Sequence, residues 1–330
     1  MANSNFDEIL ATTLKHYSKN LQDNFFKKTP LLFELSKKGR IRMVGGGQSI
    51  VEPIMYANGD AGAYGAWDQI SIAPVDTASA AEYPWRQLYA SIAISGIEEA
   101  QNSSKEAIIN LLEAKIMQAE KTLKQLLNSS LFGDGTGNSG KDFLGLEALI
   151  GDETSSVTTV GGIDATTATY WRSPVFAPAE LTLGAVKHAI NSASDGADGP
   201  KFLVTTQDLY EALEDLMSQQ VQYEDVEAAN AGFKTITVQG IPCYWDRDCT
   251  ADTMYGVDTD TLKLVGHSQR WMKQSPFSQN LASAHATSGA SNVVDARYSL
   301  ITCYGNLVTN ERRRNFKLTV TPEEEGGVVG

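Results

Sequence analysis

The chain has 330 residues and a formal net charge of −13, and 42% of its residues are hydrophobic. This length provides one large domain or two moderate ones, and no run of about eighteen apolar residues is present that could cross a membrane. The acidic balance argues against a free-standing nucleic-acid binder, because such proteins are usually basic and an acidic chain repels phosphate.

The N-terminal segment combines a predicted helix with an apolar cluster and an excess of positive charge. Residues 5–23 carry apolar side chains at helical spacing, and further apolar residues follow up to position 33. Residues 1–45 hold eight basic and four acidic residues, a net of +4, so the remainder carries −17. We expect a basic arm that lies across the acidic body of a neighbouring copy, and uneven solvated charge is the alternative. The polar residues 1–10 lack the hydrophobic stretch of a secretory signal.

Residues 46–96 are predicted to form a long two-stranded hairpin. Residues 50–56 suit a strand, and residues 88–94 alternate, with the even-numbered apolar positions facing one way. The segment between them is rich in Gly, Ala and Asp, and its Asn58-Gly59 pair predicts a turn with positive φ. Because a two-stranded hairpin is marginal alone in water, we expect it to need a surface from another subunit.

The longest predicted helix covers residues 97–130. This stretch contains neither Pro nor Gly and carries one apolar stripe, and it would be about 50 Å long. Its heptad is not strict enough for a coiled coil, so we expect the helix to lie against a sheet. The glycine-rich residues 133–140 end it.

The most informative stretch of the chain is predicted to run strand, helix, strand and turn. Phe202–Thr206 is apolar or β-branched and follows a proline, and Thr206 or Asp208 can cap the helix that comes next. Residues 233–238 alternate, and Gly240-Ile241-Pro242 fixes a turn. We also predict a helix that begins at Thr182, strands over 254–257, 262–265, 298–308 and 316–320, and a polar loop over 275–292.

The sequence offers two weak candidates for a chemical site. Gly135–Lys141 matches the first seven positions of a Walker A loop, but Asp142 stands where a Ser or Thr should hold Mg²⁺, and a helix precedes the loop instead of a strand. Cys243 and Cys249 lie close together in the chain, but a zinc site needs further ligands at defined positions. We therefore predict no catalytic, metal-binding or cofactor-binding residue and no enzymatic activity.

Arg312-Arg313-Arg314 is the sharpest cluster of charge. Three interpretations are contact with nucleic acid, an intersubunit salt bridge, and an edge strand defended by charge; we favour the second and third. On an alternating strand, Arg312 and Arg314 would share one face and Arg313 would point the other way.

The order of arm, hairpin, long helix, glycine-rich exit, α/β unit and late strands resembles the HK97-like fold of tailed-phage major capsid proteins. The phrases that carry the resemblance are Pro30–Leu35 with Lys37-Lys38-Gly39, Phe132–Gly137, Gly145-Leu146, Tyr170-Trp171-Arg172 and Gly240-Ile241-Pro242. The resemblance implies an α+β fold divided into an N-terminal arm (1–45), an E-loop hairpin (46–96), a spine helix with P-domain (97–180), an α/β A-domain (181–290), and C-terminal P-domain strands with a tail (291–330).

The resemblance implies a coat protein that assembles through hexamers and pentamers into an icosahedral shell around the phage genome. Its expected place is the virion, after assembly in the host cytoplasm. The implied partners are other copies of the chain, separate scaffolding and portal proteins, a decoration protein, and DNA enclosed without sequence-specific binding; no membrane is implied. Residues 46–96 contain no lysine, so the lysine cross-link of some members is not expected. Two alternatives stay open: an encapsulin-like bacterial shell around cargo and, less favoured, a soluble α/β enzyme using residues 180–265.

Intersubunit contacts are expected where apolar or basic side chains gather on the arm, the hairpin and the arginine cluster. The candidates are Phe25, Phe26, Leu31, Phe33, Lys37, Lys38, Arg40, Arg42, Tyr64, Trp67, Arg86, Arg312 and Arg314.

Overall fold

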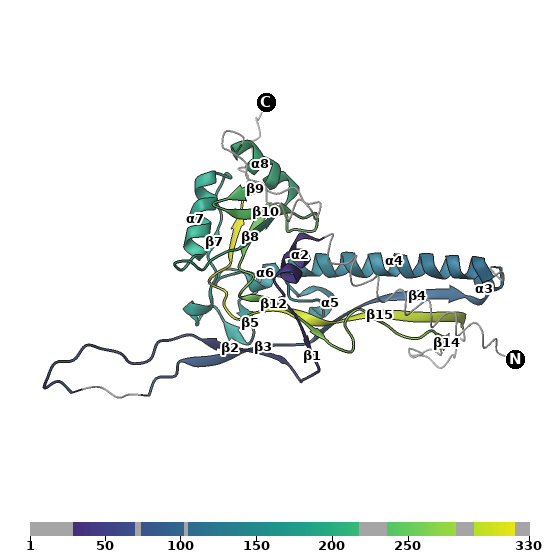
Figure 1. The fold of residues 1–330 in the computed structure, drawn as a ribbon, viewed down its shortest axis with the longest axis horizontal. Helices are drawn as coiled ribbons and strands as arrows, with labels where there is room; N and C mark the ends of the chain where they lie inside the picture. Colours follow the sequence, from purple (N-terminus) through teal and green to yellow (C-terminus); the bar gives the residue numbers. More distant parts are fainter. Residues whose placement is uncertain (1–28, 70–73, 102–104, 218–235, 282–293, 321–330) are drawn as a thin grey trace, which may run out of the picture.

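The structure, a computed structural model, describes residues 29–69, 74–101, 105–217, 236–281 and 294–320. The predicted helix over residues 5–23, and with it Phe25 and Phe26, lies outside the described residues. The described part is an α+β fold with two six-stranded sheets, a long helix and a two-stranded hairpin that projects from the body (Figure 1).

The first sheet is organised around its longest strand, β15. One edge of β15 pairs with β4, and the other edge pairs in succession with β12, β13 and β14, all antiparallel, while β1 adds to β12 in parallel. The bounds of these strands are β1 (Ile41–Val44), β4 (Arg86–Ser95), β12 (Leu262–His267), β13 (Lys273–Gln274), β14 (Ser278–Leu281) and β15 (Val294–Thr309).

A long helix, α4 (Lys105–Phe132), runs beside β4 and β15 (Figure 1). Its 28 residues make it about 42 Å long, and a shorter helix, α3 (Gly96–Gln101), precedes it. Leu123 and Leu127 of the helix are buried, and so are the even-numbered residues of β4 from Leu88 to Ile92. The predicted long helix and the predicted alternation along 88–94 are thus confirmed.

The second sheet has the strand order β7-β16-β11-β8-β10-β9 and carries the α/β unit. The fold has two apolar cores: the first lies between the first sheet, α4 and one face of the second sheet, and the other lies between α7, α8 and the opposite face of the second sheet. Every residue of β8 is therefore buried. Helix α7 starts at its N-cap Thr182 as predicted, and the Thr182 hydroxyl caps it by accepting from the Ala185 amide at 3.1 Å. The bounds are β7 (Val175–Phe176), β8 (Phe202–Thr205), β9 (Ile236–Val238), β10 (Ile241–Trp245), β11 (Thr253–Val257), β16 (Phe316–Thr319), α7 (Leu183–Ala193) and α8 (Gln207–Met217).

Short elements connect the two sheets and the hairpin. Helix α2 (Pro30–Lys37) begins with a proline, whose fixed φ suits a first helical turn. The others are α5 (Gly137–Gly140), α6 (Leu146–Leu149), the 3₁₀ turn η1 (Thr169–Trp171) and the strand pair β5 (Thr159–Val160) and β6 (Ile163–Asp164).

The hairpin differs from the prediction in its second strand. β2 (Ile50–Met55) pairs with β3 (Ala78–Tyr83), from Ile50 opposite Tyr83 to Met55 opposite Ala78. Residues 88–94 belong instead to β4, inside the first sheet. The alternation correctly gave the buried face of this strand, but a period of two contains no information about which strand lies alongside.

Strand pairing also differs from the predicted division of the chain. β12, β13 and β14 fall within residues 181–290 but pair with β15 in the first sheet, and β14 occupies part of the stretch predicted as a loop. β16, from the C-terminal segment 291–330, crosses to the second sheet and pairs with β11. Each sheet therefore takes strands from both sides of the predicted boundaries.

Candidate assembly surfaces

The tip of the hairpin, residues 56–77, exposes large aromatic side chains far from either core. We call it the excursion; its described residues are 56–69 and 74–77. Trp67 is 97% exposed and Tyr64 is 70% exposed. A small turn presents Trp67, since the Asp68 carboxylate accepts from the Gly65 amide at 2.6 Å. An aromatic ring contributes a large apolar area when it is buried. Two rings so exposed therefore indicate a surface that binds another protein.

The base of the hairpin is held firmly to the body. Glu52 is buried and accepts from the Lys263 ammonium at 2.7 Å, with Arg42 at 3.6 Å from its other oxygen. The ring of Tyr56 stacks on Tyr170 with centroids 4.9 Å apart. These contacts join the first two strands to β12 and the 169–171 turn, so the excursion leaves the body from a fixed root.

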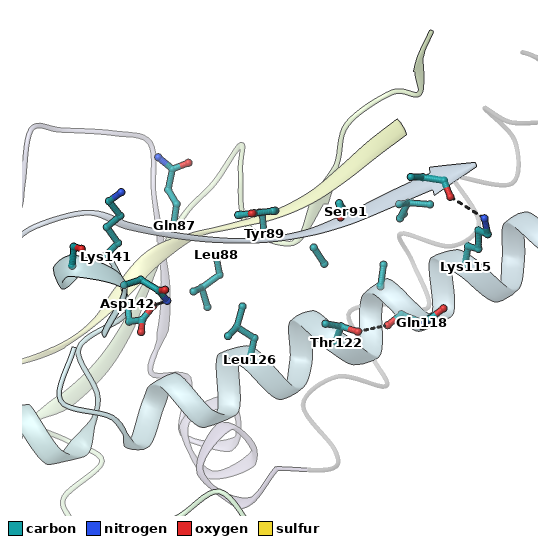
Figure 2. A pocket seen from close by; sticks show the side chains of 16 residues that line it. Gln87, Leu88, Tyr89, Ser91, Lys115, Gln118, Thr122, Leu126, Lys141 and Asp142 are labelled. Carbon is teal, nitrogen blue, oxygen red and sulfur yellow. Dashed lines mark hydrogen bonds between the residues drawn. The ribbon is translucent and has the colours of Figure 1, made fainter. Parts of the chain in front are cut away.

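A groove of about 840 Å³ runs between α4 and β4 (Figure 2). Tyr89 and Leu126 supply exposed apolar surface to it. Lys115 lines the groove towards its α3 end, donating to the Ala93 carbonyl at 2.9 Å and to Glu98 at 2.6 Å. At the other end lie Asn138, Ser139, Lys141 and Asp142, with the Asn138 amide donating to Asp142 at 2.7 Å.

One wall of the groove is an open sheet edge. Of the strands that the structure describes, β4 pairs with β15 alone, so its opposite edge has no strand partner along ten residues. An unpaired edge of this length is a template for strand addition. The sequence prediction missed the groove residues, although Tyr89 lies on the face opposite the apolar one in the 88–94 alternation, which was a usable signal.

The basic residues of the arm divide into two groups. Lys37 and Lys38 are exposed at the end of α2, and the Lys37 ammonium lies 6.0 Å from the centre of the Phe33 ring. Arg40 instead forms an ion pair with Asp260 of the same chain, and Arg42 approaches Glu52. The two arginines thus have acidic neighbours within the subunit, which the charge pattern did not predict.

Two predicted contact residues are inside the subunit, and these predictions are wrong. Leu31 is fully buried in the first core, because its helix α2 packs one face inward. Arg312 is also fully buried, and its guanidinium donates to the carbonyls of Leu149, Trp171 and Ala148 at 2.8, 3.1 and 3.2 Å. Burial lowers the pKa of the Arg312 guanidinium to about 10.

The arginine cluster lies in the turn between β15 and β16 and not on an alternating strand. Arg313 is exposed, whereas Arg314 is half-buried and pairs with Glu311 at 3.0 Å and Asp198 at 3.3 Å. Arg86 is half-buried at the start of β4. These two side chains remain candidates for contact only at their exposed atoms.

The cysteines and the glycine-rich loop, which were the candidates for a chemical site, do not form a metal-binding or phosphate-binding site in the described ranges. Cys243, Cys249 and Cys303 are buried free thiols, and burial raises the pKa of each. Within the described ranges no three metal-ligating side chains gather. Residues 137–140 form α5 directly after the long helix, so the glycine-rich loop lacks the preceding strand of a phosphate-binding site. None of the helices in the described ranges is long and apolar enough to span a bilayer.

Comparison with known proteins gives one family and one fold. The family model of the SU10 major capsid protein matches residues 88–298, and no curated protein matches the chain. The capsid asymmetric unit of cyanophage A-1(L) superposes with a TM-score of 0.64 at 19% identity, covering 87% of this chain and 93% of that one.

Two further structures share the fold at lower identity. The capsid of a native GTA particle has a TM-score of 0.53 at 10% identity and covers 87% of this chain and 90% of its own. The SrpI encapsulin complex of Synechococcus elongatus has a TM-score of 0.53 at 9% identity and covers 86% of both chains.

Proposed function

The chain belongs to the SU10 major capsid protein family, and we propose that its copies join into a closed shell by placing the excursion of one subunit in the α4–β4 groove of the next. It is a coat protein with the HK97-like fold. The observation that supports this contact best is the exposure of Trp67, 97%, on a segment that touches neither core.

The groove has the properties that such an occupant needs. Its volume, about 840 Å³, falls in the range of sites that enclose several rings. Tyr89 and Leu126 offer apolar contact, and the open edge of β4 offers backbone hydrogen bonds to an extended segment. Aromatic anchors in a desolvated pocket supply much of the binding energy at protein interfaces.

Membership of this family supports a proposal for the finer organisation. We propose that the copies form hexamers and pentamers of an icosahedral shell around a phage genome, with separate scaffolding, portal and decoration proteins. The net charge of −13 supports enclosure of DNA without sequence-specific contact, because an acidic surface repels phosphate. The encapsulin match rests on 9% identity and supports the shared fold alone. Nucleic acid inside purified particles supports a phage capsid, and a packaged enzyme would support the encapsulin alternative.

Substitution of the two tip aromatics tests the contact. Tyr64→Ser with Trp67→Ser should leave the circular dichroism and thermal stability of the subunit unchanged, since neither ring packs against a core. Assembly should weaken by about 2 kcal/mol or more per contact, seen as a higher critical concentration in sedimentation. Trp245→Ser, another exposed tryptophan but on the second sheet, is the matched control. Equal loss of assembly in both proteins would contradict the assignment.

Cross-linking locates the partner surface. Trp67→Cys combined with Tyr89→Cys should give disulfide-linked oligomers under oxidation, while each single variant should stay largely uncrosslinked. The three native cysteines are buried and do not interfere. Linked oligomers from the single variants alone, or none from the pair in assembled particles, would place the excursion elsewhere.

A further inference from the structure

A buried amide and two carboxylates connect the long helix to the second sheet. Asn128 comes from α4, while Asp246 and Asp248 come from the turn that follows β10. The Asn128 amide nitrogen donates to Asp246 Oδ1 at 2.9 Å and to Asp248 Oδ2 at 2.7 Å. The Asp246 amide in turn donates to the Thr205 carbonyl at 2.9 Å, which fixes the turn to β8.

The hydrogen bonds to Asp246 are distributed unevenly between its two oxygens. Oδ1 accepts from Asn128 and also from the Asp248 amide at 3.0 Å. Oδ2 has no donor within the described ranges, and neither does Asn128 Oδ1. Both side chains are deeply buried, at 6% and 4% exposure. Two buried acceptors without donors, on side chains already joined by one hydrogen bond, are costly unless a donor is supplied to them.

We propose that Asp246 binds a proton on Oδ2 and donates it to Asn128 Oδ1, so that the two side chains form a closed acid–amide pair that fastens α4 to the second sheet. The pair then contains two hydrogen bonds, one in each direction, and every buried polar atom in it is satisfied. Deprotonation releases one proton to solvent and leaves a carboxylate oxygen facing an amide oxygen.

The surroundings favour the protonated form. Burial raises the pKa of Asp246 most, the Asp248 charge raises it further, and the hydrogen bonds from the Asp248 amide and Asn128 oppose both. The neighbouring Cys249 thiol is itself held neutral, because burial raises its pKa, and Arg247 is exposed on the same turn. A metal ion fits less well than a proton, because calcium takes about six or more oxygen ligands and the two free oxygens are enclosed.

Because the Asp246–Asn128 pair contains this proton, its contribution to stability depends on pH. Since the pKa of Asp246 is raised in the folded chain, the stability that this group contributes is complete below the unfolded aspartate value of about 3.9. It is lost as the pH rises through the folded value. We therefore expect the attachment of α4 to the second sheet to be stronger in acid than above the folded pKa.

Asp246→Asn tests the proposal in the full chain, because an asparagine imitates the protonated acid at every pH. The unfolding equilibrium constant of the wild type, relative to that of the variant, should rise with pH by up to about tenfold per unit and then level off. Asp248→Asn lowers the folded pKa of Asp246 alone, so the rise should level off at a lower pH and be smaller in total, without being abolished. Parallel stability curves for wild type and Asp246→Asn would overturn the proposal.

A spectroscopic measurement covers the case in which the variant folds poorly. Above the ordinary aspartate pKa of about 3.9, the infrared difference spectrum between the wild type and Asp246→Asn should contain a protonated-carboxyl band, which Asn128→Asp should alter. Absence of such a band, with a bridging water between the two side chains at high resolution, would assign the site to water. Both readouts concern the single subunit, so they are independent of whether the excursion docks in the groove.

Discussion

At the scale of single residues, the clearest departure from the sequence prediction is Arg312. Three adjacent arginines suggest a solvated surface, yet the first of them, Arg312, is fully buried and its charge has a structural role. It donates three hydrogen bonds, to two carbonyls of α6 and to the carbonyl of Trp171. These bonds hold the turn before β16 against α6 and the 169–171 turn. The planar guanidinium suits several fixed acceptors at once.

Arg312→Lys should therefore destabilise the subunit. A lysine ammonium keeps the charge but cannot reach three carbonyls in the arginine geometry, so buried acceptors lose their donors. We expect the free energy of unfolding to fall by about 3 kcal/mol in urea denaturation. Arg313→Lys, one residue further along and exposed, should change it by less than about 0.5 kcal/mol. A similar change in the two proteins would show that the buried hydrogen bonds matter little.

Glu120 gives a second prediction at this scale. Burial on α4 raises the pKa of its carboxyl to about 7, and its Oε1 has no hydrogen-bond partner within the described ranges. Because the folded pKa is raised, the stability from this group is complete below the unfolded glutamate value of about 4.3 and is lost as the pH rises through 7. In Glu120→Gln, the free energy of unfolding should therefore change less with pH between about 4.3 and about 7 than it does in the wild type.

The measurement is urea denaturation against pH in the Asp246→Asn background, which removes the other proposed titration. Glu214→Gln, an exposed glutamate on α8, is the control. An unchanged pH profile in Glu120→Gln, or the same flattening in the control, would contradict a buried carboxyl at this position.

Among the helices and strands, local patterns predicted structure well wherever the structure depends on the sequence of that element alone. The start of α7 at Thr182, the long helix and the buried face of residues 88–94 were all predicted from the sequence. The strand that pairs with residues 88–94 could not be predicted. The alternation of Leu88 and Ile92 is equally compatible with β2 and with β15, and only the packing of the whole fold selects β15. The groove could not be read for the same reason, since its walls are β4 and α4, brought together by tertiary packing.

A shortened hairpin tests the role of the excursion. Tyr56 and Thr77 face each other across the hairpin, with the Tyr56 amide donating to the Thr77 carbonyl at 3.0 Å. Replacing residues 57–76 by Asn-Gly, which favours a tight type I′ turn, should keep β2 paired with β3 and leave circular dichroism and stability close to those of the wild type. Sedimentation should then find no shells. Normal shells from this protein would show that the excursion is dispensable.

At the scale of the whole molecule, shape and charge both indicate a subunit built for contact with its own copies. The body buries two cores, and the hairpin reaches beyond it (Figure 1). The groove lies between α4 and β4 (Figure 2). The arm is +4 against −17 for the rest, although Arg40 uses its charge within the subunit. A chain that exposes an aromatic tip and an open sheet edge reaches its most stable state when neighbours cover both.

Electron microscopy of assembled particles can show whether the excursion of one copy fills the groove of another. We expect closed shells in which density for Tyr64 and Trp67 lies between β4 and α4 of the adjoining subunit. Shells with an unfilled groove would contradict the claim, and so would a chain that remains monomeric at high concentration.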